Sequence, residues 1–205
     1  MLDTDGLELD TIQEQENIVI DTANDILLYR LSTTPNNHIY KKYREDQENK
    51  IERINELYPQ IEGIMFESVF YLACKKCLSW EINISTGLQD IEGVDFILGP
   101  KNASIPIDVT LDEKKYPNKV KDHNKYTLLI PNIKEYFHNL IYERDINYKS
   151  FLEDIYKTNY ELLMNNNQSF QINGDLAENP TKKLVTLSER RHEDMLAILF
   201  IFVKP

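Results

Sequence analysis

Residues 93–111, which read Gly-Val-Asp-Phe-Ile-Leu-Gly-Pro-Lys-Asn-Ala-Ser-Ile-Pro-Ile-Asp-Val-Thr-Leu, decide the fold that we expect. Two runs rich in Ile, Val, Phe and Leu, residues 94–98 and 105–111, flank the turn-forming residues 99–102. Apolar runs of this length on either side of a Gly-Pro turn predict two neighbouring antiparallel strands. We therefore place this hairpin at the centre of a β-sheet.

The segments on both sides of the hairpin extend the predicted sheet. Residues 81–85 alternate between apolar and polar side chains, which predicts a preceding strand, and residues 87–90 are typical of a turn. Residues 126–130 predict a fourth strand. The segment 112–125 is long enough for a short helix and a parallel crossover to that strand. The expected order is a three-stranded meander, a crossover helix and a strand.

Helices are predicted before and after this sheet. In residues 61–78 the apolar positions recur at spacings of three and four, as on one face of a helix. The other predicted helices cover residues 7–31, 39–58, 133–142 and 148–164. The segment 188–203 combines a helix-start pattern with an apolar run, and we leave helix and strand open there.

These elements define an α/β fold with helical additions at both ends. We expect an N-terminal helical extension in residues 1–59, an α/β core in residues 60–131, and a C-terminal helical part in residues 132–205 that packs on the same core. The length of 205 residues is appropriate for one hydrophobic core.

Composition and charge narrow the class of protein. The 23 Lys and Arg against 34 Asp and Glu give a net charge of -11, which argues against a protein that coats nucleic acid non-specifically. A phosphate-binding surface is expected in residues 99–125, which hold six lysines and four acids.

No apolar run is long enough for a membrane span, the N-terminus is acidic, and Cys74 and Cys77 provide no disulfide framework or zinc site. We therefore expect a cytoplasmic protein with no membrane partner.

Three carboxylates lie in apolar segments, where an uncompensated charge is unfavourable. Asp95 and Asp108 interrupt the two central strands, and Glu67 interrupts the apolar helix that precedes the sheet. If the two strands are neighbours, Asp95 and Asp108 can bind one Mg²⁺ ion, with Glu67 as a third ligand. Structural roles also remain open: Asp95 bonded to backbone amides, Asp108 paired with a lysine, and Glu67 on the surface.

These residues resemble the PD-(D/E)xK superfamily of restriction-endonuclease-like nucleases. The resemblance covers residues 60–131 and consists of Glu67, the Gly-Val-Asp step ending at Asp95, and the triplet Asp108-Val109-Thr110. It implies a restriction-endonuclease-like core in which the acids bind Mg²⁺ or Mn²⁺ and a lysine orients the attacking water. Thr110 occupies the position of that lysine and carries no charge. Lys114 is the best substitute, followed by Lys115, because a strand that continued to residue 114 would place Lys114 on the face of Asp108.

The expected function is that of a metal-dependent nuclease with Glu67, Asp95, Asp108 and Lys114 as catalytic residues. We expect nucleic acid as the partner, DNA rather than RNA, and leave a homodimer or a partner subunit open. The alternative is a non-catalytic scaffold or specificity subunit with the same fold, which the loss of the lysine at Thr110 favours. A third hypothesis is a helical interaction protein whose acid pattern is accidental.

Overall fold

The computed structural model describes residues 4–56, 62–99, 104–120, 124–131 and 147–171. Its helices are α1 (Thr4–Ser32), the 3-10 helix η1 (His38–Tyr40), α2 (Lys41–Glu56), α3 (Glu62–Cys77), α4 (Gly87–Ile91), α5 (Tyr116–Lys119) and α7 (Tyr148–Gln171). Its strands are β1 (Ile82–Ile84), β2 (Phe96–Leu98), β3 (Ile105–Thr110) and β4 (Tyr126–Leu129). The protein is therefore mixed α/β, as the change in hydrophobic period predicts.

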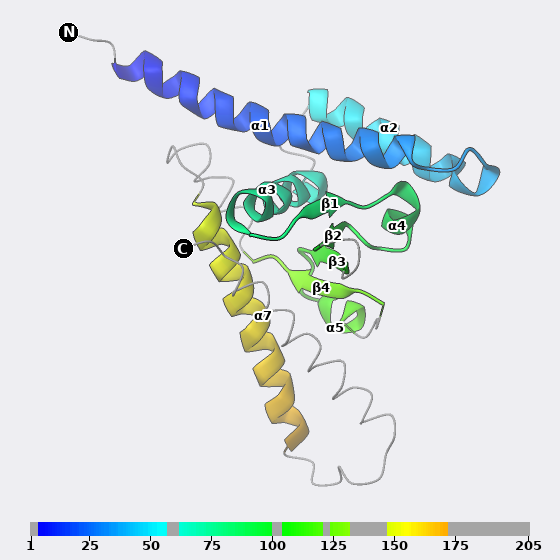
Figure 1. Ribbon diagram of the computed structural model, residues 1–205, viewed down its shortest axis with the longest axis vertical. Helices are drawn as coiled ribbons and strands as arrows, with labels where there is room; N and C mark the ends of the chain where they lie inside the picture. Colours follow the sequence, from blue (N-terminus) through cyan, green and yellow to red (C-terminus); the bar gives the residue numbers. More distant parts are fainter. Residues whose placement is uncertain (1–3, 57–61, 100–103, 121–123, 132–146, 172–205) are drawn as a thin grey trace.

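The four strands form one sheet in the order β1-β2-β3-β4. β1 pairs with β2 and β2 with β3 in antiparallel orientation, whereas β3 and β4 are parallel. The short helix α5 lies in the connection between the two parallel strands and beside β4 (Figure 1). The predicted meander and the crossover to a parallel strand are both confirmed.

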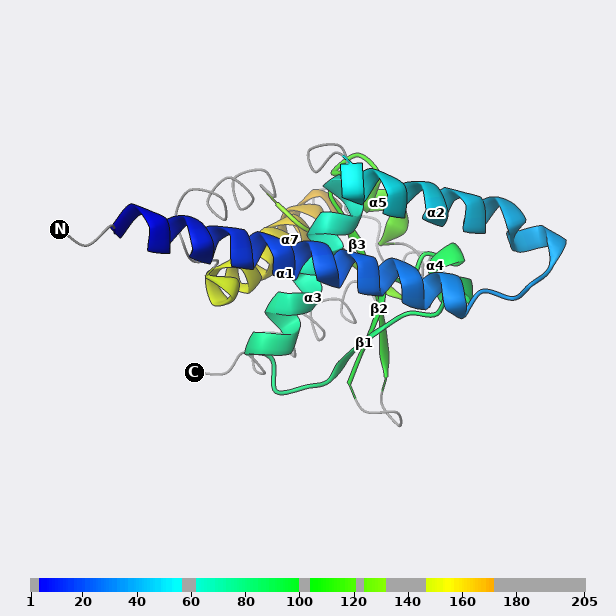
Figure 2. The ribbon, with the colours of Figure 1, turned by 90° about the horizontal axis from the view of Figure 1, so that it is seen from above.

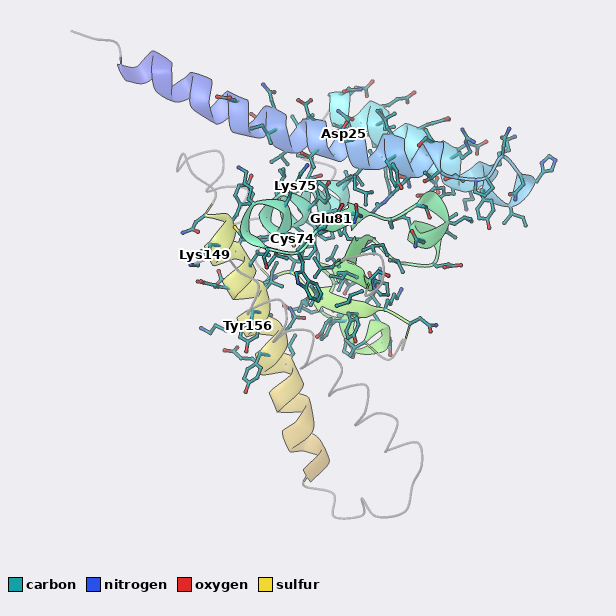
Figure 3. All side chains as sticks on the ribbon, in the orientation of Figure 1. Asp25, Cys74, Lys75, Glu81, Lys149 and Tyr156 are labelled. Atoms are coloured by element: carbon teal, nitrogen blue, oxygen red, sulfur yellow. The ribbon has the colours of Figure 1, made fainter. Side chains whose placement is uncertain are left out.

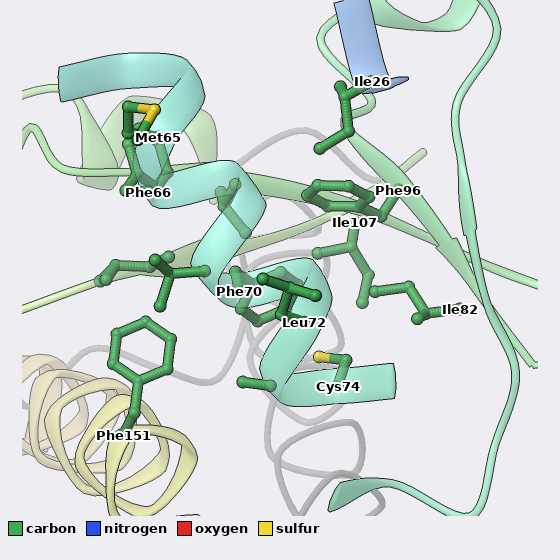
Figure 4. Packing of buried hydrophobic residues seen from close by; sticks show 14 of the residues in the cluster. Ile26, Met65, Phe66, Phe70, Leu72, Cys74, Ile82, Phe96, Ile107 and Phe151 are labelled. Atoms are coloured by element: carbon green, nitrogen blue, oxygen red, sulfur yellow. The ribbon is translucent and has the colours of Figure 1, made fainter. Parts of the chain in front are cut away.

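The hydrophobic core lies between α3 and the sheet. Phe70 of α3 is fully buried, and its ring centroid is 5.6 Å from that of Phe96 on β2 (Figure 4). Ile107 of β3 pairs with Phe96 and belongs to the same cluster. Burying aromatic and aliphatic side chains of this size contributes about 1.5–3 kcal/mol each, so the α3–sheet contact is a main source of stability.

The N-terminal helix is part of this core. Figures 1 and 2 show α1 and α2 side by side, with α3 crossing α1, and the contacts between these elements agree. Val19, Ala23, Ile26 and Leu27 of α1 are all fully buried in the cluster that contains α3 and the sheet. Ala23 follows Val19 by four residues, and Ile26 and Leu27 follow Ala23 by three and four, which gives α1 a single buried stripe.

Some elements differ from the predictions or lie outside the described residues. Residues 87–91 form helix α4 instead of a turn, because Thr86 accepts a hydrogen bond from Gln89 N and the Gln89 side chain accepts one from Thr86 N, a capping box. β3 ends at Thr110, before the predicted end at residue 111. The predicted helix at 133–142 and the segment 188–203 lie outside the described residues. Among the helices described, none combines the length and apolar character that a membrane span needs.

A buried asparagine joins α7 to β4. Asn159 Oδ1 accepts a hydrogen bond from Leu129 N at 2.9 Å, and Asn159 Nδ2 donates to Leu129 O at 2.7 Å. The Asn159 residue is fully buried. It therefore satisfies a backbone donor and a backbone acceptor that have little access to water.

We expect Asn159→Ala to lower the free energy of unfolding by about 2–4 kcal/mol, because it leaves both backbone groups of Leu129 without a partner. Urea unfolding followed by circular dichroism measures this loss. Asn83→Ala, at an exposed position of β1, is the matched control and should change stability by no more than about 0.5 kcal/mol. Equal losses in the two variants would contradict the assigned role.

Candidate functional site

A buried arginine brings three acids together at one end of the sheet. Arg30 of α1 is 1% exposed. Its Nη1 atom lies 2.7 Å from Glu67 Oε2 and 2.9 Å from Asp90 Oδ1. Its Nη2 atom donates to the backbone oxygen of Asp95 at 3.1 Å and lies 3.8 Å from Asp95 Oδ1. We call Arg30, Glu67, Asp90 and Asp95 the Arg30 cluster.

The buried charges shift one another's protonation. Burial by itself lowers the pKa of Arg30, but the charges of Glu67, Asp90 and Asp95 outweigh it, so the pKa is raised and Arg30 stays cationic. Burial raises the pKa of Asp95 well above its usual value, and the charge of Glu67 raises it further. Burial also raises the pKa of Glu67, against the opposing charge of Arg30. The charge of Arg30 therefore does not fully offset the effect of burial on the pKa values of Glu67 and Asp95.

Helix α4 and Tyr43 position the fourth member of the cluster. Gly87 lies so close to α1 that a Cβ atom at this position would overlap Thr34 Oγ1 and the carbonyl oxygen of Arg30. This close approach places Asp90, one turn further along α4, beside Arg30. Tyr43 of α2 donates a hydrogen bond to Asp90 Oδ2 at 2.7 Å. Asp90 therefore links α1, α2 and α4.

Asp108 lies in a second group of charges, formed by β3, α5 and β4. Lys119 Nζ donates to Asp108 Oδ1 at 2.7 Å, and Lys125 Nζ is 3.4 Å from Asp108 Oδ2. Thr127 Oγ1 donates to Asp108 Oδ2 at 3.3 Å, from the position that pairs with Asp108 across β3 and β4. We call Asp108, Lys119, Lys125 and Thr127 the Asp108 cluster.

The two clusters adjoin. Asp95 directly precedes β2 and donates its backbone N–H to the carbonyl oxygen of Ile107, the residue before Asp108, at 2.7 Å. Asp95 Oδ2 accepts a hydrogen bond from the backbone N–H of Val109, the residue after Asp108, at 2.7 Å. The charge of Asp108 also contributes to the raised pKa of Asp95. The sheet therefore brings the carboxylates of Asp95 and Asp108 into one electrostatic neighbourhood.

A glycine in a left-handed conformation supports this junction. Gly93 has a φ of 80°, which side-chain-bearing residues adopt rarely, and a Cβ atom there would overlap Lys125 Nζ. Lys125 Nζ donates to the carbonyl oxygens of Gly93 at 3.0 Å and of Glu92 at 3.2 Å. Gly93 thus leaves room for Lys125 to connect the backbone just before β2 with the carboxylate of Asp108.

The structure brings together three of the four predicted site residues. Glu67 and Asp95 share the Arg30 cluster, and Asp108 lies beside them. Lys114 is placed differently, because β3 ends at Thr110 and Lys114 lies in the exposed turn that follows. The choice of Lys114 depended on a strand that continues to residue 114, and β3 does not extend that far. Thr110 is buried and accepts a hydrogen bond from Asp112 N at 3.3 Å.

Sequence reasoning missed six residues of this site: Arg30, Tyr43, Asp90, Lys119, Lys125 and Thr127. The sequence did single out Arg30, because it is the one basic residue beside eight acids in residues 1–32. Lys119 and Lys125 belong to the lysine-rich segment 99–125, but their spacing along the chain does not show which lysine reaches Asp108. Tyr43 and Asp90 carry no sequence signal that separates them from surface residues.

The raised pKa of Asp95 predicts a pH-dependent stability. In EDTA Asp95 stays protonated to a higher pH in the folded protein than in the unfolded chain, so its contribution to the free energy of unfolding falls as pH rises from about 4 toward the raised pKa. Asp95→Asn removes this loss of stability, which amounts to about 1.4 kcal/mol for each unit by which the pKa is raised. The amide oxygen of the variant can still accept the hydrogen bond from Val109 N. Urea unfolding from pH 4 to 8 should give equal stability at pH 4 and a more stable variant at pH 8. Exposed Asp25→Asn is the control, and a difference that shrinks with rising pH would contradict the prediction.

Comparison of this chain with known protein families, with curated protein sequences and with solved structures finds no match in any of the three.

Proposed function

We propose that this protein is a metal-dependent nuclease that hydrolyses phosphodiester bonds, with DNA as the expected substrate. One observation carries the proposal: the Asp95 carboxylate accepts a hydrogen bond from the backbone N–H of Val109, the residue after Asp108, and a lysine is bonded to Asp108. The element order supports it, since a helix, a three-stranded meander, a crossover helix and a parallel strand is the order that the sequence resemblance implies. The restriction-endonuclease-like core is part of this proposal.

The energetics of the two clusters also favour a functional role. Four acids and three cations are gathered at one end of the sheet, and Arg30 and Asp108 are each 1% exposed. Buried ion pairs contribute little net stability, and apolar residues of similar volume often serve as well or better. Groups with strongly shifted pKa values that share one neighbourhood are typical of catalytic sites.

The donor atoms are chemically suited to Mg²⁺. Asp95 Oδ1 and Glu67 Oε1 accept no hydrogen bond from the described residues, and every carboxylate oxygen has two lone pairs. Within the described segments, no three His, Cys, Asp or Glu side chains are already arranged to hold an ion. Mg²⁺ commonly needs only one or two carboxylates, because water and substrate phosphate complete its octahedron. Asp95 and Asp108 would hold the ion, with Glu67 as a third ligand.

The chain's own residues have distinct roles in this proposal. A bound divalent ion would supply Lewis acidity and a more acidic water. Lys119 replaces the charge missing at Thr110, and its Nζ atom, already fixed at 2.7 Å from Asp108, is positioned to stabilise the charge of a phosphate beside that carboxylate. Arg30 limits the repulsion between Glu67, Asp90 and Asp95. Val109 N–H orients the Asp95 carboxylate.

Asp108→Asn tests the proposal directly. Wild-type protein should bind Mn²⁺ or Mg²⁺ in calorimetric titration and cleave DNA only when the ion is present. The variant should bind at least about tenfold more weakly and lose cleavage, because hard divalent ions need charged oxygen ligands. Asp25→Asn, at an exposed position on α1 (Figure 3), is the matched control. Equal metal affinity in wild type and Asp108→Asn would refute the assigned ligand.

A non-catalytic scaffold is the second candidate, and a specific observation favours it. Asp95 is bonded to a backbone amide and Asp108 to lysines, which are the structural roles that the sequence left open for them. In a scaffold these contacts would serve only to compensate buried charge. Absence of cleavage in the wild type with Mg²⁺ and Mn²⁺, together with its appearance in Thr110→Lys, would support this candidate.

A further inference from the structure

A groove of about 640 Å³ adjoins the Arg30 cluster on the side of α2 and α4. Its walls include Tyr40 at the end of η1, Tyr43 of α2, and Asp90 and Ile91 of α4. The volume lies within the range of small-ligand sites. Asp90 belongs both to the Arg30 cluster and to the groove, but the other lining residues of the groove belong to neither cluster.

One face of α2 supplies cations to the groove. Lys42, Lys50 and Arg53 line it, together with two acids, Asp46 of the same helix and Asp90 of α4. The three cations are exposed, and none of them has an ion pair within the described segments. In a chain with a net charge of -11, a groove whose three cations outnumber its two acids is a local site for an anion.

The spacing of these cations suits an extended anion better than a compact one. From Lys42 to Arg53 the helix rises about 16 Å, at about 1.5 Å per residue. Successive phosphates of a nucleic-acid strand are separated by a few ångströms, so a strand of several nucleotides can contact more than one cation. A single inorganic phosphate can contact only one end of the row.

Aromatic side chains indicate which form of nucleic acid fits. Tyr40 and Tyr43 line the groove beside the cations. Tyrosine rings stack on bases that are not paired, and cationic grooves with such rings are typical of single-strand binding sites. The bases of an intact duplex are stacked on one another and do not present these faces.

The groove is also connected to the candidate catalytic residues. Asp90 lines the groove, accepts a hydrogen bond from Tyr43 and lies 2.9 Å from Arg30. Arg30 in turn contacts Glu67 and Asp95. A strand that lies along α2 therefore passes Asp90, which Arg30 joins to two of the acids to which the proposed function assigns catalysis.

We propose that the groove between α2 and α4 binds a single-stranded segment of the nucleic-acid substrate, with phosphates on Lys42, Lys50 and Arg53 and a base on Tyr40. The proposal rests on the proposed function for its substrate, but the binding itself requires no catalysis. It makes the substrate a single strand, or a duplex with an unpaired segment.

Fluorescence anisotropy with labelled oligonucleotides in EDTA tests the groove without cleavage. Wild-type protein should bind a single-stranded 12-mer more tightly than a duplex of the same sequence. Lys42→Glu/Lys50→Glu should weaken single-strand binding at least about tenfold and reduce the slope of log K against log salt by about 1.4, the value for two lost phosphate contacts. Tyr40→Ala should weaken binding about tenfold through lost stacking.

Lys149→Glu/Lys157→Glu is the matched control, because it makes the same charge change at exposed positions of α7, where Lys149 lies remote from α2 (Figure 3). It should retain most of the wild-type affinity. Equal losses in the two double variants, tighter binding of duplex, or no binding by wild type would each overturn the groove proposal. Loss of binding in Lys42→Glu/Lys50→Glu without any cleavage by wild type would instead refute only the nuclease proposal.

Discussion

Replacing Arg30 by methionine is expected to lower the free energy of unfolding by about 3–5 kcal/mol, because it leaves several acids without their shared cation in a buried site. Arg30 contacts Glu67 at 2.7 Å and Asp90 at 2.9 Å, and both acids are largely covered. Urea unfolding at pH 7.5 in EDTA measures the loss. The loss should decrease at pH 5, where more of the acid is protonated.

A second variant separates charge from packing. Arg30→Met/Asp95→Asn should recover part of the stability lost in Arg30→Met, since one of the uncompensated acids has been removed. Arg44→Met, on α2, is the control for loss of an arginine and should change stability by no more than about 0.5 kcal/mol. An additive double variant would show that Arg30 and Asp95 do not interact, contrary to the structure.

Lys119→Met is expected to reduce metal-dependent cleavage by about 10²- to 10³-fold, the usual effect of removing one charge-stabilising group. Lys125 remains 3.4 Å from Asp108 in this variant, so the carboxylate keeps a cation and the fold is retained. Rates of DNA cleavage at saturating Mg²⁺, with circular dichroism as the folding check, provide the measurement. Lys149→Met is the control for loss of an exposed lysine.

Lys114→Ala distinguishes the structural assignment from the expectation based on sequence. Lys114 lies in an exposed turn, and its backbone N–H donates a hydrogen bond to Asp112 Oδ1. We expect cleavage within about twofold of the wild-type rate. A large loss in Lys114→Ala together with normal cleavage by Lys119→Met would restore Lys114 and exclude Lys119.

The sheet was predictable from sequence because its signals are local. The apolar runs at residues 94–98 and 105–111 and the turn between them specify two strands without reference to the rest of the chain. The periodicity of residues 61–78 likewise identifies α3. Helix α4 was not predicted, since five residues are too few for a periodic pattern and its capping box was not recognised.

The candidate site was predictable only in part, because its charges come from distant segments. Asp95 and Asp108 stand out as acids in apolar strands. Arg30 is 37 residues from its partner Glu67. Lys119 is 11 residues from Asp108, and the turn and short helix α5 between them follow no simple spacing rule. Sequence spacing within one strand suggested Lys114, but the early end of β3 removed the geometry on which that choice depended.

The contact between α7 and β4 has a consequence for self-association. β4 is the outermost strand on its side of the described sheet, and outermost strands can recruit a strand from a second molecule through free backbone groups. Asn159 already occupies the N–H and C=O of Leu129 with its own amide group. Another chain can add at this position only after α7 leaves. While α7 is docked, a strand from a second molecule therefore cannot pair with Leu129.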